Sequence, residues 1–125
     1  MESGKKYVLI AEKNSDWREL YKGELEKAFP DIIIDELTSN LGGDLVERVL
    51  SNKYAMAMSN DGMMDCTGIE AVKEIRRAGN KIPIYLITGD GLMEQTAKNA
   101  GATGYYDRSK FRMDDLVTEL HQYLR

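Results

Sequence analysis

The sequence has little cysteine, proline and tryptophan, and it contains no long hydrophobic run. Its one cysteine, Cys66, excludes an internal disulfide and a metal site built from several cysteines, and it fits a reducing compartment. No apolar stretch approaches the roughly 18 residues that a membrane-spanning helix needs, and no signal peptide is recognisable. We therefore expect a cytoplasmic protein that does not enter the membrane.

A surplus of positive charge is also absent. The chain has 17 basic and 21 acidic residues, which gives a formal net charge of −4. This balance argues against direct binding to nucleic acid or to an anionic membrane. A chain of 125 residues can build one domain with a proper core but not two. We expect a polar lead-in over residues 1–6 and a single domain over residues 7–125.

Short apolar runs alternate with amphipathic segments throughout this domain. The runs predict strands over residues 7–11, 32–37, 54–60, 82–88 and 105–106. Helical spacing, as between Trp17, Tyr21 and Leu25, predicts helices over about 17–28, 41–50, 69–75, 92–100 and 113–124. Five β-α units in strict alternation predict a doubly wound α/β fold, with a parallel five-stranded sheet of order 2-1-3-4-5 and helices on both faces.

Local signals mark several helix ends. Asn14 or Ser15 is expected to cap the first helix, because their side-chain oxygens can accept from free backbone N–H groups. Thr67 and Glu70 have the spacing of a capping box at the third helix. The glycine pair at 42–43 predicts that the second helix begins late.

Polar residues follow three of the predicted strands. Because sites in α/β sheets lie at the carboxyl ends of the strands, we expect Glu12, Lys13, Asn60 and Thr88 to converge there. The residue that ends the third strand, Asn60, is an amide and not an acid. Lys13 is expected to pair with Glu12, so that internal ion pairs close the pocket in place of a metal ion.

Further motifs surround these positions. They are Met63–Met64, Gly68 eight residues after Asn60, Gly89 after Thr88, the run 101–106 with Tyr105 in it, and Arg108–Ser109 just beyond. Over essentially its whole length the chain thereby resembles a receiver domain of two-component response regulators, which has a flavodoxin-like fold. The resemblance places Glu12 and Lys13 at the acidic pair, Asn60 at the phosphoacceptor aspartate, Thr88 at the switch hydroxyl, Tyr105 at the switch aromatic, Arg108 at the lysine and Ser109 at the proline.

The departures from the family pattern concern the chemistry. Asn60 is a poor nucleophile and has no charge to share with a metal ion. Lys13 puts a cation where a second acid belongs, and Arg108 has a bulkier, planar head than lysine. The resemblance therefore implies a degenerate receiver (a pseudo-receiver) that signals through protein–protein interaction. We expect no enzymatic activity, no aspartyl phosphorylation, no cofactor, and weak or absent Mg²⁺ binding.

Other interpretations stay open. Asp61 would be a displaced phosphoacceptor in a working phosphorelay, although we expect a solvated loop acid, because its side chain should point away from that of Asn60. Thr88 is either a switch hydroxyl or a polar strand end, and Tyr105 is either a mobile or a fixed aromatic. A flavodoxin-like small-ligand domain ranks last, because Gly89 and Gly91 lack the spacing of a phosphate-binding loop.

The resemblance also implies an interaction surface. Receivers signal through the face of the fourth helix, fifth strand and fifth helix, which here runs from about Leu92 to the end of the chain. Expected partners are signalling proteins, either a sensor kinase or an output protein, and homodimerisation through this face is a further route.

Overall fold

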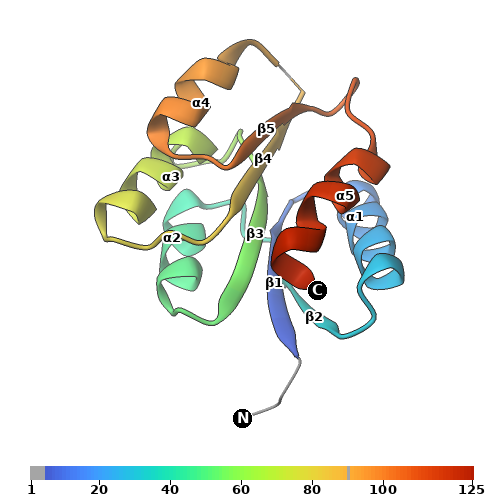
Figure 1. The fold of residues 1–125 in the computed structure, drawn as a ribbon. Coiled ribbons are helices and arrows are strands. Elements are labelled where there is room, and N and C mark those ends of the chain that lie inside the picture. The colour runs from blue at the N-terminus through green and yellow to red at the C-terminus, as the bar shows by residue number, and fades with distance from the viewer. Residues whose placement is uncertain (1–4, 90) are drawn as a thin grey trace.

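A five-stranded parallel sheet lies between two layers of helices in the computed structural model, which describes residues 5–89 and 91–125 (Figure 1). The strand order is β2-β1-β3-β4-β5, and all four neighbouring pairs are parallel. Helices α2, α3 and α4 cover one face, and α1 and α5 cover the other. The predicted doubly wound fold with strand order 2-1-3-4-5 is therefore confirmed.

The described elements follow the predicted segments closely. The strands are β1 Lys6–Ala11, β2 Ile32–Leu37, β3 Tyr54–Asn60, β4 Ile84–Thr88 and β5 Gly104–Asp107. The helices are α1 Ser15–Ala28, α2 Gly42–Leu50, α3 Gly68–Arg77, the 3-10 turn η1 Gly91–Met93, α4 Glu94–Ala100 and α5 Met113–Leu124. Within residues 5–89 and 91–125, every helix is too short or too polar to cross a membrane. Most of the expected lead-in lies outside the described residues.

Strand side chains point alternately into two hydrophobic clusters. Leu9 and Ala57 pack under α2, α3 and α4, whereas Val8, Ile10 and Met56 pack under α1 and α5. All five are completely buried. Burial of a large aliphatic side chain stabilises a fold by about 1.5–3 kcal/mol, so these central strands hold the carboxyl edge of the sheet firmly in place.

Two helix starts confirm the capping signals. The Asn14 side chain accepts a hydrogen bond from the Trp17 backbone N–H at 3.1 Å. At α3, Thr67 Oγ1 accepts from the Glu70 N–H at 3.1 Å, and Glu70 Oε1 accepts from the Thr67 N–H at 2.9 Å. Both reciprocal bonds of the capping box are therefore present.

The prediction of a late start for α2 is wrong, because the helix begins at Gly42. The cause is Asp65, which lies in the loop between β3 and α3. Its carboxylate accepts from the N–H of Gly42 at 2.6 Å and from the N–H of Gly43 at 3.0 Å. These bonds satisfy free N–H groups of the first turn and place a negative charge at the positive end of the helix dipole.

Candidate functional site

The carboxyl ends of the central strands border a pocket of about 370 Å³. Its described lining residues are Glu12, Lys13, Asn14, Trp17, Asn60, Asp61, Gly62, Ile87, Thr88, Gly89 and Arg108. The structure thus brings together the positions that the sequence placed at one edge of the sheet. Their functional roles remain predictions.

An internal ion pair closes the floor of this pocket. Glu12 is only 3% exposed, and its Oε1 accepts a hydrogen bond from Arg108 Nη2 at 2.9 Å. Its second oxygen, Oε2, accepts from the backbone N–H of Asn14 at 3.1 Å. Arg108 Nε also donates to the Tyr21 hydroxyl at 3.3 Å, and the guanidinium lies 5.0 Å from the centre of the Trp17 ring. Each carboxylate oxygen therefore already has a donor, and the arginine is held on three sides.

The expected pairing between Glu12 and Lys13 is wrong. Glu12 pairs with Arg108, whereas Lys13 is exposed, and no carboxylate within residues 5–89 and 91–125 forms an ion pair with it. Glu12 follows β1 directly and points into the domain, so the next side chain points outward. Arg18 Nη1 fixes this loop by donating to the Glu12 carbonyl at 2.8 Å. An internal pair does neutralise Glu12, but its cation comes from the other end of the chain.

Asn60 uses its amide nitrogen to hold the loop that follows β3. Nδ2 donates to the Gly62 carbonyl at 2.9 Å and to Asn40 Oδ1 at 3.4 Å. Asn40 adopts a positive φ of 60°, and its carbonyl accepts from the Met64 N–H at 2.9 Å. A carboxylate has no hydrogen to donate to Gly62 or Asn40, so this loop conformation suits an amide at position 60.

Asp61 is held at the start of α3. Its Oδ1 accepts from the Ile69 N–H at 3.1 Å, and its carbonyl accepts from the Gly68 N–H at 2.7 Å. The expectation of a solvated loop acid is therefore wrong, since Asp61 is half-buried and stabilises the helix N-terminus. Gly68 must be small, because an added Cβ would lie 3.0 Å from the Asn60 carbonyl.

The two switch positions have different environments. Thr88 ends β4 half-buried, and its carbonyl accepts from the Arg108 backbone N–H at 2.6 Å. Tyr105 is only 6% exposed and packs in the cluster beneath α2, α3 and α4. The Tyr105 ring is therefore buried in this structure.

Sequence reasoning missed several residues that complete the site. Trp17 and Tyr21 were expected only as core positions of α1, yet they contact Arg108. Asn40 was not singled out, although asparagine is the residue besides glycine that most readily adopts a positive φ. These contacts join residues far apart in sequence, so helical spacing could not indicate them.

The carboxylate oxygens in the pocket do not form a suitable site for Mg²⁺. This ion needs oxygen ligands in near-octahedral geometry, with carboxylates to supply the charge. Both oxygens of Glu12 accept hydrogen bonds, one of them from a cation, and Oδ1 of Asp61 accepts from backbone. Within residues 5–89 and 91–125, no three His, Cys, Asp or Glu side chains come together to hold a metal.

Comparison with solved structures defines the class of fold, which is that of response-regulator receiver domains. The response regulator TrrA of Thermotoga maritima, in complex with Mg²⁺-BeF, is 24% identical with a TM-score of 0.79, covering 95% of this chain and 99% of that one. A two-component response regulator of Clostridium difficile is 24% identical with a TM-score of 0.79, covering 96% of each chain. A CheY-like receiver domain of Methanospirillum hungatei is 18% identical with a TM-score of 0.77, covering 95% and 93%.

Among curated proteins, the chain is similar to the transcriptional regulatory protein TctD of Salmonella typhimurium. The two are 27% identical over 124 residues, which cover 94% of this chain and 51% of TctD. The chain thus spans about half the length of the curated relatives it matches. No family model matches the chain.

Proposed function

We propose that this chain is a degenerate receiver domain of two-component signalling, which acts through protein–protein interaction without aspartyl phosphorylation. The observation that carries this proposal is the amide at the end of β3. Asn60 is the last residue of β3, the position that the resemblance to receivers assigns to the phosphoacceptor aspartate, and its nitrogen donates to the Gly62 carbonyl. An amide offers neither the nucleophilic oxygen nor the negative charge that phosphoryl transfer and metal binding require.

The charges around Asn60 support the same conclusion. Glu12 is neutralised by Arg108, and Lys13 adds a positive charge at the rim of the pocket. A metal ion would have to displace the guanidinium from a buried carboxylate to bind there. We therefore propose a non-enzymatic domain without a cofactor, in which Mg²⁺ binding is weak or absent.

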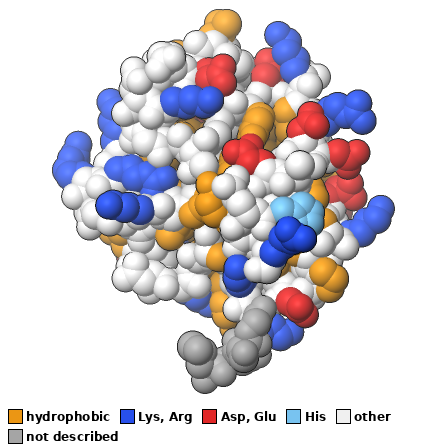
Figure 2. All heavy atoms as spheres, viewed as in Figure 1, with side chains coloured by type: hydrophobic (Ala, Val, Ile, Leu, Met, Phe, Trp, Pro, Cys, Tyr) orange, Lys and Arg blue, Asp and Glu red, His pale blue; other side chains and the backbone are white. Residues whose placement is uncertain are grey.

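We propose that partners dock on the face formed by α4, β5 and α5. Figure 2 shows acidic side chains over β5 and the start of α5 with basic ones beside them, and further basic side chains on the side of α3 and α4. Leu92 is 86% exposed and Met93 is 43% exposed just before α4.

Proposed partners are a sensor kinase, an output protein or a second copy of the chain. We place the domain in the cytoplasm, where the free thiol of Cys66 is stable. We propose that this domain makes no direct contact with nucleic acid or membrane.

The test uses amide NMR spectra recorded before and after addition of Mg²⁺ with beryllofluoride. We expect no saturable shifts at Asn60, Thr88 and Tyr105. A matched positive control is the triple variant Lys13→Asp, Asn60→Asp, Arg108→Lys, which restores the carboxylates and the lysine and should gain shifts. Saturable shifts in the natural sequence would contradict the proposal.

A second candidate function is phosphoryl acceptance on Asp61. It is favoured by one observation, namely that Asp61 lines the same pocket as Asn60. Its Oδ1 accepts from the Ile69 N–H, so acceptance there would disturb the start of α3. If beryllofluoride causes saturable shifts that Asp61→Asn abolishes, this second function replaces the first.

A further inference from the structure

Residues 107–111 form a tight turn that is closed by four hydrogen bonds to one residue. The Asp107 carbonyl accepts from the N–H groups of Lys110 and Phe111, both at 3.0 Å. Its carboxylate accepts from the Ser109 N–H at 3.0 Å and from the Ser109 hydroxyl at 2.7 Å. These bonds from Ser109 lower the pKa of Asp107, which keeps the carboxylate charged. The turn is thus stiffened by hydrogen bonds and is expected to move as one unit.

The two ends of this turn contact different parts of the molecule. Arg108 reaches into the pocket, where it binds Glu12, and its backbone N–H donates to the Thr88 carbonyl. Phe111 instead stacks on Tyr106, with ring centres 5.4 Å apart and planes inclined by 29°. One hydrogen-bonded segment therefore touches both the floor of the pocket and the aromatic side chains beneath α5.

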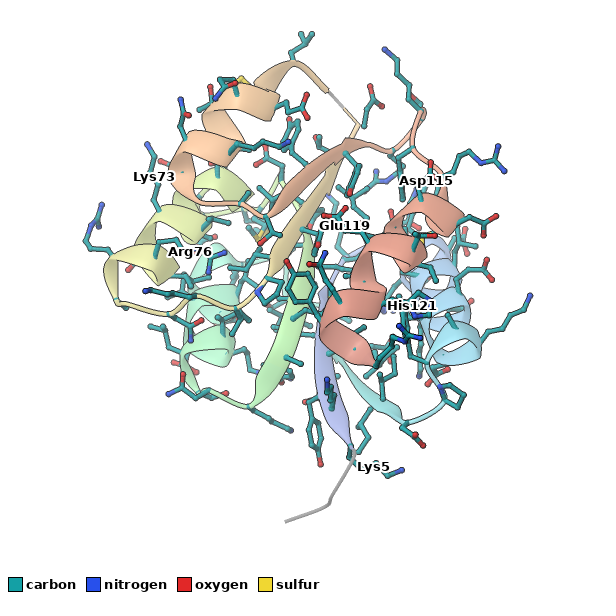
Figure 3. The ribbon with its side chains drawn as sticks, viewed as in Figure 1. Lys5, Lys73, Arg76, Asp115, Glu119 and His121 are labelled. Atoms are coloured by element: carbon teal, nitrogen blue, oxygen red, sulfur yellow. The ribbon has the colours of Figure 1, made fainter. Side chains whose placement is uncertain are left out.

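Tyr106 belongs to a cluster that seats α5 on the sheet. Its hydroxyl donates to Glu119 Oε2 at 2.6 Å, and the Tyr85 hydroxyl donates to Glu119 Oε1 at 3.1 Å. The two rings are 6.2 Å apart and nearly parallel, at 6°. Glu119 lies on the side of α5 that faces β4 and β5 (Figure 3). Burial raises the pKa of both tyrosines, so both hydroxyls keep their protons and act as donors to the one carboxylate.

We propose that the 107–111 turn couples the pocket to the position of α5. Displacement of Arg108 from Glu12 would move the turn, and Phe111 would then shift Tyr106 relative to Glu119. By reciprocity, a partner that repositions α5 would alter the Glu12–Arg108 pair. This route lies on the α1 and α5 side of the sheet, whereas the Tyr105 ring packs on the opposite side. It rests on the proposed function only for the use of α5 as a docking surface.

The test follows amide shifts and hydrogen exchange in α5 of the isolated chain, without partner or phosphoryl mimic. Arg108→Lys and Arg108→Ala should both shift amides near Glu119 and accelerate their exchange by about tenfold, as expected when one hydrogen bond of the cluster weakens. Ser109→Ala removes a hydrogen bond within the turn and changes neither a residue of the pocket nor Glu119. In a protein that carries Ser109→Ala, the amide shifts and the faster exchange in α5 that Arg108→Lys causes should be clearly smaller. Asp35→Asn is the control, because Asp35 binds Lys53 at the opposite edge of the sheet and should leave α5 unchanged.

Two results would overturn the coupling. One is a response to Arg108→Lys that stops at β1 and α1. The other is an α5 response of the same size with and without Ser109→Ala. Neither outcome depends on beryllofluoride, so failure of the coupling and failure of the proposed function can be told apart.

Discussion

Replacement of Arg108 by alanine should lower the free energy of unfolding by about 2–4 kcal/mol. Removal of one partner from a buried ion pair typically costs about 3–5 kcal/mol, because the remaining charge stays buried and unpaired. Glu12 is 3% exposed, but it keeps the hydrogen bond from the Asn14 N–H at the start of α1. The Arg108 side chain is itself 22% exposed, so water screens the ion pair and reduces the stabilisation that it provides. Because of these two features we expect a cost that lies partly below the usual range for a fully buried pair.

Glu12→Gln should be milder, at about 1–2 kcal/mol, because the freed guanidinium can turn toward water while the amide still accepts a hydrogen bond. The loss of unfolding free energy in the double variant, which carries both Arg108→Ala and Glu12→Gln, should then be smaller than the sum of the losses in the two single variants. Contacting residues in one ion pair usually show a coupling of roughly 0.5–3 kcal/mol in such a cycle.

Urea unfolding of the four proteins, followed by circular dichroism and tryptophan fluorescence, measures these differences. Trp17 lies against Arg108, so its fluorescence also reports the site directly. If the two single effects are additive, or if Arg108→Ala costs less than about 0.5 kcal/mol, the Glu12–Arg108 ion pair does not stabilise the fold as argued.

Three further predictions follow from other parts of the structure. Asn60→Asp should destabilise the domain by about 1–3 kcal/mol, because its carboxylate would face the Gly62 carbonyl without a hydrogen to donate; a more stable variant in urea unfolding would contradict this. Gly104→Ala should cost about 1–3 kcal/mol, because the new Cβ would lie 2.7 Å from a ring carbon of the fully buried Tyr85, and an unchanged melting temperature would show that the ring can yield. A hydrogen bond from a lysine lowers the pKa of Asp35 in the folded state, so its stabilisation is present above the ordinary carboxyl value and is lost as the pH falls through and below about 4. Asp35→Asn should therefore flatten the acid side of a stability-against-pH curve, and an unchanged curve would refute this.

Much of the fold could be predicted because the signals are local. The strand over residues 54–60 is a short apolar run between polar segments, and its predicted bounds match β3. Thr67 and Glu70 cap the helix that they belong to, so their spacing alone sufficed. The start of α2 was missed because its N–H groups are satisfied by Asp65, more than twenty residues away.

In the candidate site, too, the features that depend on topology were predictable, whereas the side-chain contacts between distant residues were not. Strand ends located Glu12, Asn60 and Thr88 at one pocket, since the topology fixes which edges meet. The partner of Glu12 depended on side-chain direction and reach, and the sequence neighbour Lys13 was chosen wrongly over Arg108, 96 residues away. The contacts of Asp61 with the start of α3 likewise depend on how the loop folds back.

The tethered guanidinium of Arg108 has a consequence for how the domain responds to its surroundings. A cation that belongs to the chain is present at the Glu12 carboxylate at a high effective concentration, commonly millimolar or above, and dialysis or chelators cannot remove it. The state of the pocket should therefore be the same in EDTA as in millimolar magnesium. We therefore predict a pocket whose occupancy does not follow changes in the concentration of divalent ions, because its cation is part of the chain.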